Sequence, residues 1–402
     1  MRIALITIEY ITEPSFAGGL ANYTYRLACG LRNLGHEAEV FVCGELEESF
    51  THDGIIVHRL QIRLFKYLRS LQRLNWRLRH DYDIYLIEHM LALRSGLKRR
   101  HRERPFDIVH YTHLLGCGAL RTCLPSVVRL SSYKDLRVPF GGHTTFLLSF
   151  LDDVGLKRAD AVFAPSEYVA GYVRSKLNIP VAVIRSPFIM PQEDEDASIW
   201  EQHLRARKRY GLYFGSLVEY KGVFVLSQAL KTVLEEDKDM HFVFVGRELW
   251  SKREGKGAST FILGELAAFK DRVIRFDSLH HAQLFPIIRH ADFVTLPSLD
   301  DNFPNTCLEA MALEKVVIGT RGRSFDEIFE DGKSGILCEP DDVASLVDAI
   351  RRAAAMSPDE RQRMGRFARE RIDQLVPEKT VAEHVSFYQE TINRKRRPCR
   401  TT

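Results

Sequence analysis

Residues 292–312, DFVTLPSLDDNFPNTCLEAMA, contain a short apolar run, a polar loop and the start of an amphipathic helix. The apolar run, Asp292–Leu296, is followed by Pro297 and Ser298, a pattern typical of a buried strand in a parallel sheet. The helix is predicted to begin near Asn305. A strand, a loop and a helix in this order form the repeating unit of doubly wound α/β sheets.

The same alternation occurs in both halves of the 402-residue chain. Apolar runs predict strands at Arg2–Ile8, Glu37–Val42, Gly54–Leu60, Asp107–Tyr111, Ser126–Leu130, Asp160–Ala164 and Val181–Ile184, and again at Gly211–Phe214, His241–Val245, Arg272–Phe276, Asp292–Leu296, Val316–Gly319 and Gly335–Leu337. Amphipathic stretches between them predict crossover helices. The predicted fold class is therefore α/β, with two Rossmann-like, doubly wound domains facing a cleft.

A break in this pattern separates the halves. The stretch Pro187–Arg207 contains prolines, the acidic run Glu193–Asp196 and little apolar periodicity, so it is the predicted interdomain linker. We expect an N-terminal domain over residues 1–190, with a basic insertion at about 61–104, and a C-terminal domain over 208–375. The helical tail 376–402 is expected to return to the N-terminal domain.

Composition excludes several classes of protein. Apolar residues make up 45% and charged residues 27%, which is typical of a folded globular chain. A net charge of +4 over this length does not indicate nucleic-acid binding. The seven cysteines form no CxxC pair and mostly lie in apolar runs, which favours free, buried thiols in a reducing compartment. With no apolar run long enough to span a bilayer, the expected location is cytoplasmic.

Three glycine or acidic motifs stand where strands are predicted to end. Gly18 and Gly19 open a helix over Leu20–Leu34, and first-turn N–H groups beside glycine form an anion site. The turn at 215–222, GSLVEYKG, places Lys221 where a point charge could meet a phosphate. Asp301 and Glu309 stand eight positions apart, one in the loop and one a turn into the helix, so both can face one ligand.

These motifs, followed by DGKSG at 331–335, occur in the order of the large retaining GT-B glycosyltransferase family numbered four, the glycosyl transferases group 1, which the chain resembles over nearly its whole length. The resemblance implies that two Rossmann-like domains clamp a nucleoside diphosphate sugar, held mostly by the C-terminal domain. It also implies that the acceptor enters from the N-terminal side and that catalysis is mainly positional and electrostatic.

The resemblance assigns roles to individual residues. Glu309 would bind the ribose hydroxyls, Lys221 a donor phosphate, and Asp301 the donor sugar beside the bond that breaks, at a position where the family usually has glutamate. The other residues assigned to substrate binding are Gly18, Gly19, Phe303, Asn305 and Thr306. Asp301 is one of two residues predicted to be catalytic.

The sequence departs from the family pattern at two further positions. Ser216 stands where the family has an arginine, and Arg247 is its predicted replacement, with a solvated arginine as the alternative. Ser131 stands where many relatives have a histidine that contacts sugar or acceptor. His113 is the second predicted catalytic residue, with a structural role as the alternative. No metal cluster emerges, and the family needs neither a bound metal nor another cofactor.

A basic amphipathic stretch interleaves arginines with leucines from Arg63 to Arg79 and is followed by a second cluster over Lys98–Arg104. It predicts peripheral contact with an anionic membrane on the cytoplasmic face; a solvated helical face packed through its leucines is the alternative.

The predicted function is transfer of a hexosyl group from a nucleoside diphosphate sugar, with a UDP-sugar favoured, to an acceptor hydroxyl. The acceptor could be a glycan, a lipid-linked molecule or a small molecule, and polysaccharide biosynthesis is the expected setting. Two alternatives are a non-catalytic nucleotide-sugar-binding subunit and a GT-B epimerase.

Overall fold

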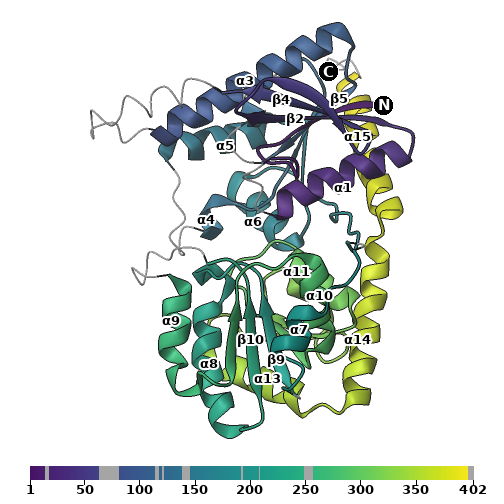
Figure 1. Cartoon of the computed structure of the whole chain (residues 1–402). Coiled ribbons are helices and arrows are strands. Elements are labelled where there is room, and N and C mark those ends of the chain that lie inside the picture. Colours follow the sequence, from purple (N-terminus) through teal and green to yellow (C-terminus); the bar gives the residue numbers. More distant parts are fainter. Residues whose placement is uncertain are drawn as a thin grey trace. The chain divides into compact units, whose positions relative to one another are not determined.

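The computed structural model describes residues 1–13, 18–62, 81–113, 117–119, 122–137, 145–191, 193–207, 209–248 and 257–396. These residues form two compact units. Figure 1 shows the chain, coloured along the sequence from purple to yellow. Unit 1 comprises the described residues of Met1–Lys134, His143–Pro187 and Leu375–Thr402. Unit 2 comprises those of Asp135–Gly142 and Phe188–Gln374.

Unit 1 contains a sheet of eight described strands in the order β3-β4-β2-β1-β5-β6-β7-β8. Their bounds are β1 Arg2–Ile6, β2 Glu37–Gly44, β3 Glu48–His52, β4 Ile55–Gln61, β5 Ile108–Thr112, β6 Ser126–Arg129, β7 Ala161–Ala164 and β8 Ala182–Val183. Neighbouring strands in this order are parallel, except β3 and β4, which are antiparallel. The central strand β1 is buried throughout, which is why it reads as a continuous apolar run.

Two features of this sheet differ from expectation. The first strand ends at Ile6 rather than Ile8, because the Thr7 hydroxyl donates to the Glu9 carbonyl at 2.9 Å and turns the chain. The antiparallel strand β3 was not expected. Its residues are mostly exposed or half-buried, so the sequence ESFTH lacks the apolar run by which the other strands were identified.

The helices of unit 1 cover this sheet. They are α1 Gly19–Asn33, α3 Asp81–Glu103, α5 Phe146–Arg158, α6 Glu167–Leu177 and α15 Pro377–Arg396. The short helix α4 Lys134–Arg137 begins at the last residue of this part of unit 1, and its other residues belong to unit 2. The C-terminal helix α15 packs against α1 (Figure 1). A Cβ at Gly30 of α1 would lie 2.5 Å from a methyl carbon of Val381 of α15, so glycine permits this close approach.

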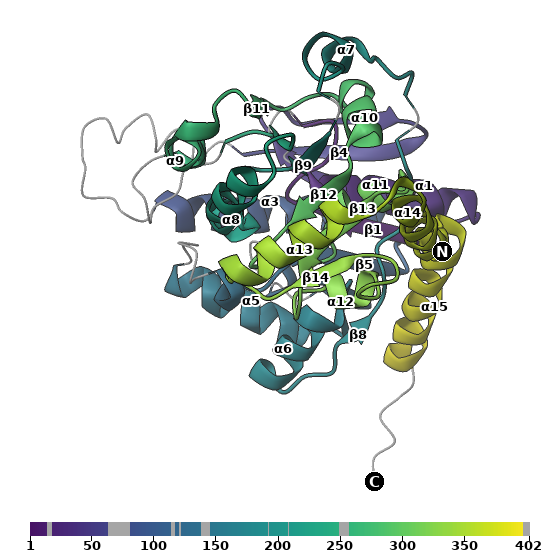
Figure 2. The ribbon, with the colours of Figure 1, turned by 90° about the horizontal axis from the view of Figure 1, so that it is seen from below.

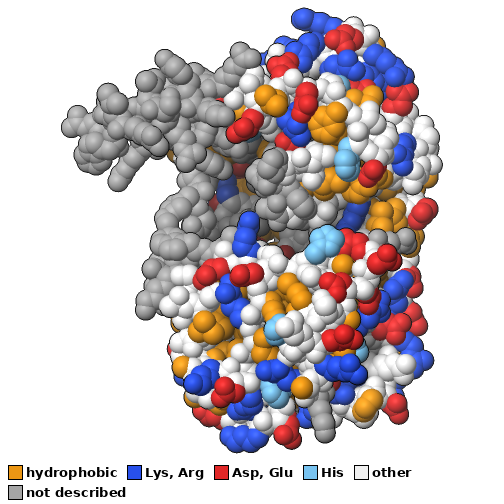
Figure 3. All heavy atoms as spheres, in the orientation of Figure 1, with side chains coloured by type: hydrophobic (Ala, Val, Ile, Leu, Met, Phe, Trp, Pro, Cys, Tyr) orange, Lys and Arg blue, Asp and Glu red, His pale blue; other side chains and the backbone are white. Residues whose placement is uncertain are grey.

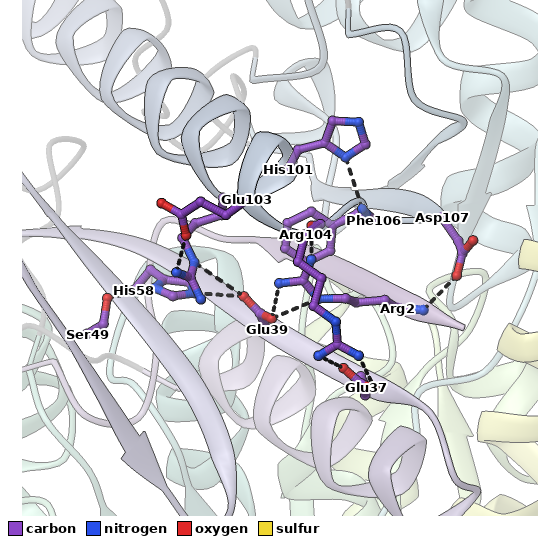
Figure 4. Close-up of polar contacts among 11 residues, drawn as sticks. Arg2, Glu37, Glu39, Ser49, His58, His101, Glu103, Arg104, Phe106 and Asp107 are labelled. Atoms are coloured by element: carbon purple, nitrogen blue, oxygen red, sulfur yellow. Dashed lines mark hydrogen bonds and ion pairs between the residues drawn. The ribbon is translucent and has the colours of Figure 1, made fainter.

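Beneath α3, a buried ion network joins β1, β2 and β4 (Figure 4). Glu39 accepts from Arg2 Nε at 3.0 Å and lies 2.8 Å from His58 Nε2. Arg2 also stacks over the Phe106 ring at 4.0 Å and donates to the Arg104 carbonyl. Burial alone raises the pKa of the Glu39 carboxyl, but the hydrogen bonds from His58 and Arg2 outweigh burial and lower it.

A second buried polar cluster ties α15 to the sheet and to α1. His384 Nδ1 lies 2.7 Å from the Thr380 carbonyl, which can only accept, so Nδ1 carries the proton and Nε2 accepts from Tyr23 at 2.9 Å. His110 of β5 lies 2.6 Å from the Tyr388 hydroxyl. Burial lowers the pKa of His384 to about 4 and lowers the pKa of His110 well below its usual range, so both are neutral at pH 7.

We expect His384 to make unit 1 less stable as the pH falls from about 6.5 to about 4. The pKa of an unfolded histidine is about 6.5, whereas that of folded His384 is about 4. Between these values the unfolded chain binds a proton that the folded chain does not. The contribution of His384 is therefore complete above pH 6.5 and falls by about 3 kcal/mol toward pH 4.

Chemical unfolding of the wild type and of His384→Gln across this pH range measures that loss. The variant cannot titrate at this position, so its loss should be smaller by about 3 kcal/mol. His203→Gln, at an exposed position, is the control. The same pH dependence in His384→Gln and the wild type would contradict the assignment.

Unit 2 contains a sheet of six described strands in the order β11-β10-β9-β12-β13-β14, all paired in parallel. Their bounds are β9 Tyr210–Phe214, β10 His241–Val245, β11 Val273–Phe276, β12 Phe293–Leu296, β13 Val316–Thr320 and β14 Ile336–Cys338. The helices are α7 Ser198–His203, α8 Val223–Glu236, α9 Ala258–Glu265, α10 His281–His290, α11 Asn305–Ala312, α12 Phe325–Ile328, α13 Val343–Ala355 and α14 Pro358–Ile372. Helices α8 and α13 lie side by side (Figure 2). The expected α/β class with two largely parallel sheets is confirmed.

The stretch predicted as a linker makes specific contacts with unit 2. Glu193 accepts from the Ala282 N–H at 3.0 Å, and Glu195 pairs with Arg289 at 2.8 Å. Trp200 of α7 stacks on His290 of α10 with ring centroids 3.8 Å apart. The acidic run thus has partners on α10, one backbone N–H group and one arginine, which a search for apolar periodicity does not detect.

The basic insertion is described only in part. Residues 63–80, which include Arg63–Arg79, lie outside the described residues. In the second cluster, Arg99 pairs with Glu47 at 2.8 Å, Arg100 pairs with Glu103, and Arg104 pairs with Glu37 at 2.6 Å. These arginines therefore have partners within unit 1, and membrane contact stays a prediction.

The described surface carries charges of both signs. Figure 3 shows basic and acidic side chains interspersed on the face in view. Within the described ranges, no helix is both long and apolar enough to cross a bilayer. Cys43, Cys307 and Cys338 are free and buried as expected, whereas Cys123 is free but exposed.

Candidate active site

Glycines bring three strand ends of unit 2 together. A Cβ at Gly222, whose φ is 73°, would lie 1.8 Å from the Pro297 carbonyl oxygen at the end of β12. A Cβ at Gly246, after β10, would lie 1.8 Å from the Gly215 oxygen after β9. These contacts require glycine, and they bring the loops after three parallel strands to one edge of the sheet.

Lys221 and Asp301 join two of these loops. Lys221 Nζ lies 2.6 Å from Asp301 Oδ2, which also accepts from the Ser298 hydroxyl at 3.0 Å. The Leu299 N–H donates to the Tyr220 carbonyl at 2.8 Å, so the same loops are also joined through their backbones. The side chains of Lys221 and Asp301 are 24% and 11% exposed, so the pair is accessible but screened less than a surface pair.

Helix α11 begins at Asn305, as the sequence predicted. Phe303 adopts a left-handed φ of 63°, and its N–H donates to the Ser324 hydroxyl at 3.2 Å. This turn directs the chain into the helix through Pro304. A Cβ at Gly215 would lie 3.6 Å from Thr306 Cγ2, so the first turn of α11 adjoins the glycine turn.

Glu309 lies one turn into α11 and is 6% exposed. Its Oε1 lies 3.6 Å from Nε2 of His281, the first residue of α10. Glu309 thus contacts a histidine of α10, whereas Asp301 contacts Lys221. The structure therefore holds the two carboxylates of the motif in different environments, one beside a lysine and one beside a histidine.

The turn that lacks the family arginine lies directly beside Arg247. The Leu217 N–H donates to the Arg247 carbonyl at 2.9 Å, and the Tyr213 hydroxyl donates to the Ser216 carbonyl at 2.7 Å. Arg247 is exposed, and no described residue forms an ion pair with it. Its predicted role as a substitute cation fits this position and stays a prediction.

The predicted residues of unit 1 lie at the carboxyl edge of its sheet. Gly18 is the N-cap of α1 with φ 141°, and no described atom lies within 4 Å of a Cβ built there. Gly19 is the first residue of the helix and is exposed. Ser131 follows β6, is half-buried, and accepts from Arg129 at 2.9 Å.

His113 is 5% exposed and stacks on Tyr133 with ring centroids 6.2 Å apart. Burial lowers the pKa of its imidazole, and the charge of Asp152 opposes that effect. His113 thus lies buried beside an aromatic ring and near the charge of Asp152, and its catalytic role stays a prediction.

Sequence reasoning missed four residues that contact the predicted ones. They are Ser298 beside Asp301, His281 beside Glu309, Ser324 beside Phe303 and Arg129 beside Ser131. Arg129 could have been identified from the sequence, because it is a lone charge within the apolar strand sequence SVVRL. Ser298 stands three residues before Asp301 in the same loop, whereas His281 and Ser324 come from other parts of the chain and give no local signal.

Two family models match the chain and together span most of it. The glycosyl transferases group 1 model matches residues 194–371, and the glycosyl transferase 4-like domain model matches residues 18–186. The first match contains Lys221, Asp301 and Glu309, and the second contains Gly18 and Ser131.

Curated relatives match over most of their length. An uncharacterized glycosyltransferase of Methanocaldococcus jannaschii is 24% identical, covering 87% of this chain and 89% of that protein. A trehalose synthase of Thermococcus litoralis is 23% identical, covering 96% and 89%.

Solved structures show the same fold. A sucrose-phosphate synthase from Thermosynechococcus elongatus superposes with a TM-score of 0.79 at 20% identity, covering 98% of this chain and 99% of that one. An E. coli structure named as trehalose-6-phosphate, bound with UDP-2-fluoro glucose, superposes with a TM-score of 0.72 at 12% identity, covering 97% and 99%. The chain therefore belongs to the group 1 glycosyltransferases, and it is a glycosyltransferase with the GT-B fold.

Proposed function

We propose that this enzyme transfers a hexosyl group from a nucleoside diphosphate sugar to an acceptor hydroxyl with retention at the anomeric carbon, and that the donor is a UDP-sugar. The observation that carries the proposal is the ion pair of Lys221 with Asp301, 2.6 Å apart, at the edge where the β9 and β12 loops meet. Donors of this class carry a diphosphate leaving group, for which a lysine at a strand end is a suitable partner.

Each charged group of the site has a role in this reaction. Lys221 stabilises the negative charge that grows on the departing diphosphate, assisted by the first-turn N–H of Thr306. Asp301 orients the donor sugar, and Glu309 accepts hydrogen bonds from the ribose hydroxyls. Arg247, exposed beside the Ser216 turn, supplies the second cation to the diphosphate.

The reaction exchanges one bond for another at the anomeric carbon. The bond from this carbon to the diphosphate oxygen breaks, and the bond to the acceptor oxygen forms on the same face. The acceptor proton passes to the departing phosphate oxygen. No residue of the chain needs to act as a nucleophile, so the protein contributes position and charge.

The neighbour bound with UDP-2-fluoro glucose supports a UDP-sugar as donor. A neighbouring synthase from Burkholderia xenovorans is in complex with glucose-6-phosphate, which supports a sugar acceptor. Transfer to a glycan or lipid-linked acceptor, and a cytoplasmic location with contact to an anionic membrane, stay predictions from the sequence.

A thermal-shift panel of nucleoside diphosphate sugars tests the donor. A ligand at 100 times its dissociation constant stabilises the folded protein by about 2.7 kcal/mol. Incubation of the stabilising sugar without acceptor then separates the candidates. Slow release of the nucleoside diphosphate supports a transferase, whereas an epimerised donor indicates an epimerase, and binding without turnover indicates a non-catalytic subunit.

A further inference from the structure

Arg129, at the end of β6, is a buried arginine whose contacts are all neutral. It is 6% exposed. It donates to the Ser131 hydroxyl at 2.9 Å and to the Ser186 hydroxyl at 3.1 Å. Its guanidinium carbon lies 3.8 Å from the centre of the Tyr23 ring. Its Nε is buried without a hydrogen-bond partner among the described residues.

Within the described part of the chain, no carboxylate forms an ion pair with Arg129. A buried cation without a counter-ion is costly, and folded proteins almost always pair one. Arg2 illustrates the usual case, since it is equally buried but hydrogen-bonded to Glu39.

The described ionisable groups that influence or contact Arg129 are neutral at pH 7. His384 and His110 are neutral at pH 7, because burial and the charge of Arg129 lower their pKa values. Burial raises the pKa of Tyr23 and of Tyr388, so these hydroxyls are also neutral. Burial lowers the pKa of Arg129 itself, but a guanidinium starts so high that it stays protonated.

The location of Arg129 is that of a ligand site. Strands β1, β5, β6, β7 and β8 run parallel, so their carboxyl ends share one edge, where doubly wound sheets bind ligands. Arg129 ends β6, Ser186 follows β8, and Tyr23 lies in the helix that follows β1. Ser131 and Ser186 are half-buried, whereas Arg129 and Tyr23 are buried.

We propose that Arg129, Ser131 and Ser186 form an anion subsite of unit 1 that binds a phosphate group on the acceptor. The hydroxyl oxygens of Ser131 and Ser186 each accept from the arginine. The Ser186 O–H can then donate to a ligand, beside the N–H groups of Arg129. The subsite thus offers a fixed positive charge and several donors, and a phosphate has only acceptors and up to two negative charges. The identity of this phosphate as part of the acceptor rests on the proposed transfer function.

Calorimetry of the full-length protein with inorganic phosphate as the probe, and with acetate in parallel, tests the subsite. We expect saturable phosphate binding that Arg129→Gln weakens about 10-fold or more, the scale of a hydrogen bond to a charged group. Ser186→Ala removes only one hydroxyl and should weaken phosphate binding less, by about 3-fold. This milder variant tests the subsite if Arg129→Gln fails to fold. No saturable phosphate binding, or equal binding by both variants and the wild type, would overturn the proposal. Arg129-dependent binding of acetate alone would overturn the assignment to phosphate.

Arg2→Gln is the matched control, because Arg2 is as buried as Arg129 but has a carboxylate partner. It should lower the melting temperature and leave phosphate binding unchanged. Arg129→Gln should not lower the melting temperature in phosphate-free buffer, since it removes an unpaired buried charge. A drop as large as that of Arg2→Gln, with phosphate affinity retained, would show a structural role instead.

Titration with UDP distinguishes this proposal from the proposed function. Arg129→Gln should bind UDP as the wild type does. If Arg129→Gln weakens UDP and phosphate by the same factor, the subsite binds the donor diphosphate and the acceptor assignment is wrong. If no nucleoside diphosphate binds while phosphate still depends on Arg129, the donor proposal fails and the subsite stands.

Discussion

Lys221→Met should lower the kcat/KM for hexosyl transfer by about 100- to 1,000-fold, the loss seen when one preorganised group that stabilises developing charge is removed. The methionine keeps most of the length of the side chain but has no charge for the diphosphate. It also leaves Asp301, whose side chain is only 11% exposed, without its cation. The turnover number should fall more than the affinity for the donor, because charge on the diphosphate grows as the bond breaks.

A transfer assay with the donor found by the thermal-shift panel measures this effect. Lys231→Met is the matched control, because Lys231 lies in the same unit on α8 and pairs with Glu265 at the surface, 3.3 Å away. We expect it to change activity by less than about 2-fold. Full activity in Lys221→Met, with the fold intact, would contradict the role of Lys221.

Substitutions of the two carboxylates Asp301 and Glu309 should have different effects on binding and turnover. Glu309→Gln should weaken UDP and UDP-sugar alike by about 1.5–3 kcal/mol, because both ligands contain the ribose. Asp301→Asn should not weaken UDP, since its proposed partner is the transferred sugar, but it should lower turnover about 100-fold. Releasing Lys221 from its ion pair in this variant leaves the lysine available to the diphosphate.

Calorimetry with UDP and a transfer assay on both variants decide this prediction. Glu314→Gln serves as a control, because Glu314 lies just after α11 and is exposed. Equal losses of UDP affinity in Glu309→Gln and Asp301→Asn would mean that both residues merely hold the loop and helix together, for which carboxylates near a helix start are a ready explanation.

The regular part of the fold was predictable because parallel strands buried on both faces are continuous apolar runs. His241–Val245 matches β10 residue for residue, and α11 begins at the expected Asn305. Strand β3 was not predictable in this way, because ESFTH is mostly solvent-exposed. Strand order and the pairing of β3 with β4 also depend on contacts that periodicity does not encode.

The chemistry of the site was predictable where a motif is contiguous. The spacing of Asp301 and Glu309 gave their placement in a loop and a helix. Their partners His281 and Lys221 come from other elements, so the separate environments of the two carboxylates required the three-dimensional structure. Arg129 shows the same limit, since its lack of a carboxylate partner is a property of its surroundings.

Hydrogen exchange of the full-length protein, with and without saturating UDP-glucose, tests most directly whether the loops of unit 2 bind the donor. Bound nucleotide should order the loops that it contacts and slow exchange of their amides. We expect slower exchange in peptides that cover residues 215–222 and 301–309, with little change in surface helices such as α13. Saturable binding with no slowing in either peptide would contradict the site.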